Sequence, residues 1–258
     1  MIKKRFELPV LKKLNLKFDI KKLQESYDEF VKGKTWDGLG NEYASLCESH
    51  TRLPKMFFKE EELKKINSVC DLNWEKSSYK QLSLTDFDEN FKIENTNQQK
   101  GSKWNKRIAL KNPKADERWF SKIKDDVPNY LRFVLKTIGN THRVRFSNLG
   151  PKSFIKPHFD YNTDYSIRVH IAIKSNKHCF NGGWDKKGIL HKQNIPIDGS
   201  LWFVNPGVKH FAVNDGDTER VHLIVSVDSQ QLLNETNLIT KTVFSKKLNS
   251  HLYQEQKV

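Results

Sequence analysis

The chain has 258 residues, of which 36% are hydrophobic, and this composition excludes an intrinsically disordered protein. No run approaches eighteen uninterrupted apolar residues, which excludes a conventional membrane-spanning helix. The formal net charge is +14, but 36 of the 45 basic residues are lysines, scattered in ones and twos. Because nucleic-acid readers favour clustered arginine, we interpret this charge as a solvated surface and expect no nucleic-acid partner.

The chain's first twenty residues lack the apolar stretch of a secretory signal. The three cysteines are odd in number and share no CxxC spacing. Such cysteines are most simply unpaired thiols in a reducing compartment. We therefore expect a cytoplasmic protein.

The N-terminal third mixes charged and apolar residues at roughly helical spacing, as in "EFVKGK" and "KEEELKKINSV". This pattern predicts a helical N-terminal layer over residues 1–77. The run "SYKQLSLT" at 78–85 predicts a strand, and the polar residues 86–118 predict a long surface excursion. A helix is predicted from Val127, with Pro128 in its first turn and Gly139 at its C-cap.

After Gly139 the hydrophobic pattern changes to period two. Strands are predicted at 142–148, 154–161, 166–174, 200–204, 209–213 and 219–227. Short strands separated by turn signals are typical of an antiparallel sandwich or closed barrel. The sequence thus predicts a mainly β domain at 78–228, followed by a polar, partly helical tail at 229–258.

Three of these predicted strands carry two polar residues at positions i and i+2, which share a face of a strand. The pairs are His158 with Asp160, Arg168 with His170, and Arg220 with His222. On the second and third strands the opposite face is aliphatic. A solvated face would normally carry Lys, Glu and Thr, so these His, Asp and Arg residues indicate an inward-facing polar pocket.

His210 is a further candidate for this polar set. Whether it shares a face with Arg220 depends on the length of the loop between the two strands. A three-residue loop over 214–216, with Gly216 left-handed, would pair residue 210 with residue 220. A two-residue loop would send Arg220 to the opposite face. Glycine at position 216 favours the longer loop, so we expect His210 and Arg220 to be neighbours in one hairpin.

Two histidines and one carboxylate are a ligand set typical of non-haem Fe(II). His158, Asp160 and His210 supply that set. Three protein ligands leave three coordination positions, two for a bidentate keto-acid and one for dioxygen. Arg220 would provide a fork for the distal carboxylate of the keto-acid.

Residues from about 127 to 228 resemble the aspartyl/asparaginyl/prolyl β-hydroxylase family of Fe(II)/2-oxoglutarate-dependent dioxygenases. The matching segments are "VPNYLRFVL", "PHFD", "RVHIAIK", "GSLWFVNPGVKH" and "RVHLIVSVD". "SYKQLSLT" resembles the first strand of the family, which extends the resemblance to 78–228. The resemblance implies a double-stranded β-helix core (jelly-roll, cupin-like) with N-terminal and flanking helices. It also implies Fe(II), dioxygen and 2-oxoglutarate as co-substrate.

The resemblance gives roles to individual residues. His158, Asp160 and His210 resemble the iron ligands of the catalytic centre. Arg220 resembles the arginine that holds the distal carboxylate of 2-oxoglutarate.

Arg168 and His170 resemble the pair near the iron-bound end of that co-substrate. Animal family members that act on secreted modules lack the carboxylate ligand, whereas this sequence keeps it as Asp160. In this respect the chain is similar to free-standing bacterial hydroxylases, including those that act on free proline.

We therefore expect a dioxygenase that hydroxylates a C–H bond of a free amino acid or an amino-acid-like small molecule. An alternative substrate is an Asp, Asn or Pro residue within a peptide or protein. An alternative of another class is a non-enzymatic cupin-like metal- or ligand-binding protein. Arg168 and Arg220 argue against this last reading, because a metal site alone needs no carboxylate clamps. The pattern identifies neither the amino acid nor the oligomeric state.

Overall fold

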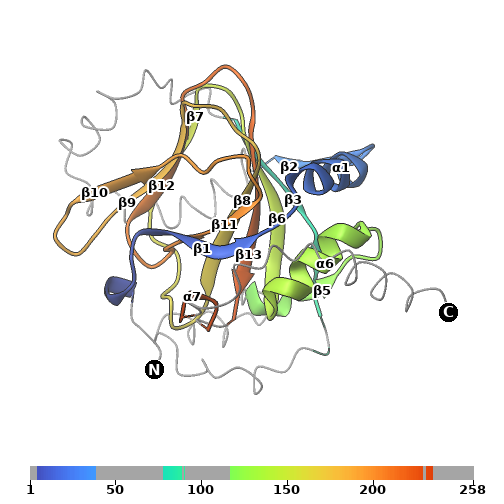
Figure 1. Ribbon diagram of the computed structural model, residues 1–258, viewed down its shortest axis with the longest axis horizontal. Helices are drawn as coiled ribbons and strands as arrows, with labels where there is room; N and C mark the ends of the chain where they lie inside the picture. The colour runs from blue at the N-terminus through green and yellow to red at the C-terminus, as the bar shows by residue number, and fades with distance from the viewer. Residues whose placement is uncertain (1–4, 39–77, 89, 91–116, 229–230, 235–258) are drawn as a thin grey trace.

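The computed structural model describes residues 5–38, 78–88, 90, 117–228 and 231–234 (Figure 1). Its core is built from two antiparallel sheets. The larger contains, in spatial order, β1 (Leu11–Lys17), β11 (Ser200–Val204), β8 (Ile167–Lys174), β13 (Arg220–Val227), β6 (Thr141–Leu149), β3 (Tyr79–Ser83) and β2 (Asp37–Gly38). The smaller contains β10 (Leu190–Gln193), β9 (Cys179–Trp184), β12 (His210–Asn214) and β7 (Ser153–His158).

The remaining described elements lie around this core. They are a small ladder of β4 (Thr85–Asp86) with β5 (Lys122–Ile123), the helices α1 (Ile20–Val31), α6 (Asn129–Ile138) and α7 (Gln231–Asn234), and the 3-10 turns η1 (Arg5–Glu7) and η5 (Glu117–Trp119). Arg220 of the larger sheet donates a hydrogen bond to Asn181 of the smaller, so the two sheets face each other. The predicted fold class, a double-stranded β-helix with flanking helices, is confirmed.

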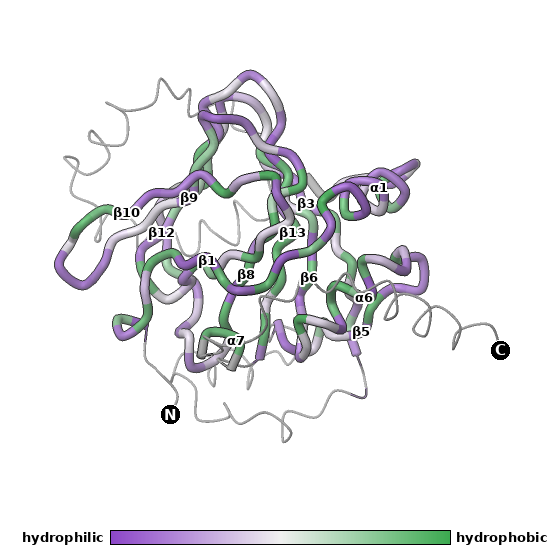
Figure 2. The backbone as a smooth tube through the Cα atoms, in the orientation of Figure 1, coloured by the Kyte–Doolittle hydropathy of each residue, from purple (hydrophilic) through white to green (hydrophobic). Residues whose placement is uncertain are grey.

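Helices α1 and α6 cover the outer face of the larger sheet (Figure 1). The Asp19 carboxylate caps α1 by accepting from two backbone N–H groups, and α6 ends at Gly139, whose φ is +73°. Tyr27 of α1 packs edge-on against Phe146 of β6, with ring centroids 4.9 Å apart. In Figure 2, hydrophobic residues run along β8, β13 and α6, while much of α1 is hydrophilic. This outer layer is the main hydrophobic core.

The inner face of the larger sheet is polar, and β13 shows the alternation most clearly. Val221, Leu223 and Val225 belong to the core under the helices. Arg220 and His222 point the other way and are nevertheless buried, each 1% exposed. The prediction that these polar side chains face inward is therefore confirmed, and a solvated sheet face is excluded.

The prediction of a helical layer over residues 1–77 is wrong for residues 11–17. These residues form β1, which pairs with β11 at the edge of the larger sheet. Lys13 and Lys17 are exposed, as expected of an edge strand, whereas Lys12 is half-buried and donates to the carbonyl oxygen of Leu233. Helix α1 agrees with the prediction, whereas residues 39–77, 91–116 and 235–258 lie outside the described residues.

The predicted hairpin between His210 and Arg220 is wrong. Strand β12 pairs with β7 and β9, whereas β13 pairs with β6 and β8, so the chain crosses from one sheet to the other. Gly216 is not among the described glycines with positive φ. The crossing is held by Asn214, whose side chain donates to the carbonyl of Thr218 and accepts from the N–H of Gly216. His210 and Arg220 come from opposite sheets.

Two smaller differences concern strand ends and glycine-rich segments. The strand predicted at 154–161 ends at His158, because the N–H of Asp160 donates to the carbonyl of Pro206 instead of continuing the ladder. The "NGG" turn signal lies inside β9, where Gly182 and Gly183 allow close approach of neighbouring side chains and backbone. The hairpin β9–β10 was therefore missed.

Gly199 fixes the N-terminal segment to the sheet and gives a test of this arrangement. Its φ is +78°, and a Cβ there would overlap the carbonyl oxygen of Phe18. We expect Gly199→Ala to lower the free energy of unfolding by at least about 3 kcal/mol, measured by denaturant titration. Gly188→Ala is the matched control, since φ is +76° there but no atom lies within 4 Å, and it should cost only about 1–2 kcal/mol. Equal losses in both variants would contradict the packing of Phe18 against Gly199.

Candidate metal centre and co-substrate pocket

Three candidate metal ligands lie close together at one end of the β7–β12 ladder in the smaller sheet. His158 ends β7 and His210 begins β12, and the two residues are directly paired across the ladder, with ring centroids 4.3 Å apart. The Asp160 Oδ2 atom lies 3.8 Å from His158 Nε2 and 3.5 Å from His210 Nε2. The potential ligand atoms of all three residues lie within 4.8 Å of one another.

The state of these side chains fits a divalent metal. His210 Nδ1 lies 2.9 Å from the carbonyl oxygen of Val208, which can only accept, so Nδ1 carries the proton and Nε2 keeps its lone pair. Burial, followed by repulsion from His158, lowers the pKa of His210, which therefore stays neutral. Ligand atoms about 2.1 Å from one ion lie roughly 3 Å apart, so small side-chain rotations would close the set. Two imidazoles and one carboxylate suit non-haem Fe(II).

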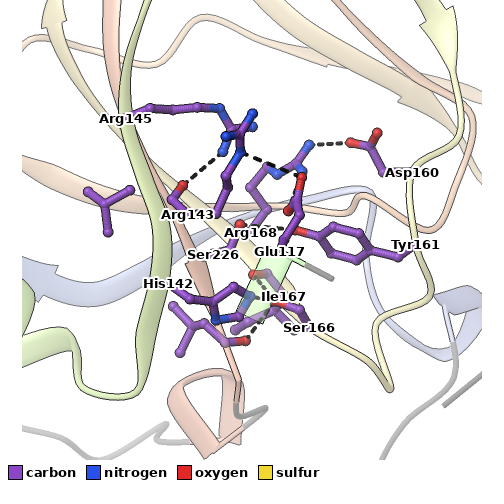
Figure 3. A network of polar contacts seen from close by, with 12 residues as sticks. Glu117, His142, Arg143, Arg145, Asp160, Tyr161, Ser166, Ile167, Arg168 and Ser226 are labelled. Atoms are coloured by element: carbon purple, nitrogen blue, oxygen red, sulfur yellow. Dashed lines mark hydrogen bonds and ion pairs between the residues drawn. The ribbon is translucent and has the colours of Figure 1, made fainter. Parts of the chain in front are cut away.

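Arg168 from β8 holds the carboxylate of this set (Figure 3). Its guanidinium donates to Asp160 Oδ2 and to Tyr161 Oη, the latter at 3.1 Å, and lies 3.7 Å from Glu117 Oε2. Burial alone would raise the pKa of Asp160, but the positive charge of Arg168, together with His158 and His210, holds that pKa well below its usual value. Asp160 is thus an anion prepared to bind a cation.

Tyr161 secures Arg168 from the other side. Burial raises the pKa of Tyr161 to about 12, so its phenol stays protonated. The hydroxyl lies 3.0 Å from Ser226 Oγ and accepts from Arg168. Ser226 is paired with Arg168 across β13 and β8, so the two strands fix the position of the guanidinium.

Arg220 lies deeper between the sheets and has no carboxylate partner among the described residues. Its Nη2 atom donates to Asn181 Oδ1 at 2.6 Å and lies 2.9 Å from His222 Nδ1, while its Nε has no hydrogen-bond partner. Burial lowers its pKa to about 10, so it remains a cation at neutral pH. Burying a cation without an anionic partner destabilises the folded protein. A bound carboxylate would supply the missing negative charge, so the site is suited to one.

Two neutral histidines line the space beside Arg220. His170 Nδ1 lies 3.4 Å from His222 Nδ1, and the ring planes are perpendicular. Burial and then the charge of Arg220 lower the pKa of both histidines well below the ordinary value. Their Nε2 atoms have no hydrogen-bond partner in the described part of the chain, so they remain available to a ligand.

The six predicted site residues thus fall into two groups. His158, Asp160 and His210 come together with Arg168, while His170 and Arg220 lie in the deeper group. Sequence reasoning missed Glu117 and Asn181. Glu117 lies in a stretch read as a polar excursion, and Asn181 in one read as a turn, so neither carried a spacing signal.

Comparisons with known proteins find a family match over more than half of this chain. A family model described as "Aspartyl/Asparaginyl beta-hydroxylase" matches residues 71–230, which include all six residues.

In the described part of the chain, no helix has the length and apolar character needed to cross a membrane.

Three solved structures are similar to parts of this chain. A 2OG-Fe(II) oxygenase family oxidoreductase from Burkholderia pseudomallei is 16% identical, with a TM-score of 0.33 over 67% of this chain and 80% of that one. A Pseudomonas putida prolyl-4-hydroxylase is 11% identical, with a TM-score of 0.38 over 84% and 90%. An oxalate oxidase in complex with glycolate is 14% identical, with a TM-score of 0.28 over 35% and 43%.

The match to oxalate oxidase thus spans less than half of that protein. The family model, in contrast, spans more than half of this chain and includes both groups of site residues. The chain belongs to the aspartyl/asparaginyl β-hydroxylase family.

Proposed function

We propose that the protein is an Fe(II)/2-oxoglutarate-dependent dioxygenase, with residues 78–228 as the dioxygenase domain. It hydroxylates a C–H bond of a free amino acid or an amino-acid-like small molecule. One observation carries this proposal. The candidate ligands His158, Asp160 and His210 lie in the same interior as Arg220, a buried cation with no anionic partner among the described residues.

The residues of the site have distinct tasks in this proposal. His158, Asp160 and His210 hold the iron, which when bound supplies dioxygen activation and binds the keto-acid end of the co-substrate. Arg168 keeps Asp160 ionised and oriented toward the two histidines. Its link to Tyr161 and Ser226 prevents the carboxylate from turning away.

The deeper group binds the other end of 2-oxoglutarate. The Arg220 guanidinium pairs with the distal carboxylate, and Asn181 and His222 fix its orientation. His170 and His222 are neutral, so they add hydrogen-bonding capacity without competing for the negative charge. All residues of β13 are buried, which keeps water from this end of the pocket.

Two alternatives differ in what they require of this interior. A peptidyl Asp, Asn or Pro substrate would use the same iron and co-substrate residues and differ only at the entrance. A non-enzymatic cupin-like binding protein would not need a buried arginine held ready beside a metal site. Arg220, which has only neutral partners in the part of the chain that the structure describes, therefore supports the enzyme.

The metal assignment gives the first test of the proposal. His158→Ala removes one of three ligands, so we expect at least a 100-fold loss of Fe(II) affinity and loss of 2-oxoglutarate turnover. Metal content and succinate release measure the two effects. His178→Ala is the matched control, because His178 is exposed and outside the site. Undiminished turnover in His158→Ala, or in metal-stripped protein, would contradict the assignment.

The co-substrate assignment gives the second test. Arg220→Met keeps the bulk of the side chain and removes its charge. We expect KM for 2-oxoglutarate to rise about 10- to 100-fold, because a hydrogen bond to a charged group is worth about 1.5–3 kcal/mol. Fe(II) affinity should stay nearly unchanged. The variant should also lose its preference for 2-oxoglutarate over 2-oxobutanoate, which lacks the distal carboxylate. Lost iron with unchanged co-substrate affinity would show that Arg220 is misassigned.

A further inference from the structure

Three arginines gather around a single carboxylate beside the metal centre (Figure 3). Glu117 of η5 lies 3.8 Å from Arg143 Nε and 3.7 Å from Arg168 Nη2. Arg145 shares a face of β6 with Arg143, two residues away. Burial alone would raise the pKa of Glu117, but Arg168, Arg145 and Arg143 together lower it. Glu117 is therefore an anion that pairs with Arg143 and Arg168 and is also stabilised by the charge of the nearby Arg145.

Among the three arginines of this cluster, Arg145 is the one without an ionic partner in the described residues. It is only 6% exposed, and its one side-chain hydrogen bond is donated to the carbonyl oxygen of Arg143 at 2.9 Å. Within the described ranges it makes no ion pair, and its Nε has no hydrogen-bond partner. Burial, followed by repulsion from Arg168 and Arg143, lowers its pKa. A buried guanidinium with so few partners is suited to binding an anion.

Arg145 lines the same interior as the co-substrate residues but at a separate position. It is paired with Ile224 across β6 and β13, and Ile224 is paired with His170 across β13 and β8, so the three residues form one row on the inner face. Arg220 is paired with Leu149, four residues further along β6. The backbones of Arg145 and Arg220 are thus roughly 13 Å apart along the strands. Their guanidinium groups also have different partners, the carbonyl of Arg143 for Arg145 and Asn181 for Arg220.

The charges of the described residues in this cluster also favour a further anion. Arg143, Arg145 and Arg168 carry three positive charges, against two negative charges on Glu117 and Asp160. A divalent metal at Asp160 would increase the positive excess. The two negative charges of 2-oxoglutarate are directed to the metal and to Arg220. Among the described residues, the positive charge around Arg145 is therefore left without an anion.

We propose that Arg145, assisted by the partly buried Arg143, binds the carboxylate of the substrate. Glu117 is the positioning residue that holds Arg143 and Arg168 in place beside it. This inference rests on the proposed function and narrows its substrate to a free amino acid with an unmodified carboxylate. An amino-acid amide cannot form the charge-assisted pair with the guanidinium.

The test measures binding without turnover. Isothermal titration calorimetry in the absence of oxygen, on protein loaded with Fe(II) and 2-oxoglutarate, is carried out with the twenty L-amino acids and the amides of those that bind. We expect at least one free amino acid to bind and its amide to bind at least about 10-fold more weakly. This comparison uses the unaltered chain and does not depend on any variant folding.

Substitutions then assign the effect to Arg145. Arg145→Gln should weaken the amino acid about 10- to 100-fold, and Arg145→Lys, which keeps the charge but not the fork, should lose less. Arg143→Gln should show a smaller loss of the same kind. Lys136→Gln is the matched control, since it removes one positive charge from the exposed face of α6 and should change nothing.

The outcomes separate this inference from the proposed function. Failure of the unaltered protein to bind 2-oxoglutarate would refute the proposed function itself. Normal 2-oxoglutarate binding with no amino acid bound would refute only the inference. The same holds for an amide that binds as well as its acid, or for unchanged amino-acid affinity in a folded Arg145→Gln protein.

Discussion

Buried positive charge is the constraint on which the rest of this structure depends. The interior between the sheets contains Arg145, Arg168 and Arg220, each nearly inaccessible to solvent. Arginine does not lose its proton at neutral pH, so each guanidinium needs an anion or a full set of acceptors. Arg168 has Asp160 and Glu117, whereas Arg220 has only neutral partners among the described residues. The unmatched charges are where ligands are expected.

The fold tolerates this charged interior because its hydrophobic core lies on the other face of the larger sheet. The aliphatic residues of β8 and β13 pack outward under α1 and α6, which frees the inner face for polar side chains. Each central strand therefore serves two layers, one for stability and one for chemistry. A substitution such as Gly199→Ala acts on the first layer, and Arg220→Met on the second.

Period-two alternation was enough to predict the inner face, because it depends only on neighbouring residues in one strand. It identified His158 and Arg220 before any pairing was known, whereas His210 was added through a hairpin that the structure does not contain. It failed where the outcome depends on distant segments. The crossing between β12 and β13 is stabilised by the side-chain hydrogen bonds of Asn214. Residues 11–17 form a strand because they pair with the exposed edge of β11. Asp160 does face the histidines, but through a backbone hydrogen bond to Pro206 beyond the strand's end. Glu117 reaches the site from a segment whose sequence gave no sign of it.

The central claim is that one interior holds a metal at His158, Asp160 and His210 and an anion at Arg220. A crystal structure grown without oxygen in Fe(II) and 2-oxoglutarate, with anomalous scattering measured at the iron edge, tests it most directly. We expect one iron peak bonded to these three side chains, and a co-substrate whose distal carboxylate pairs with Arg220. An iron peak elsewhere, or a carboxylate that leaves Arg220 unpaired, would contradict the account.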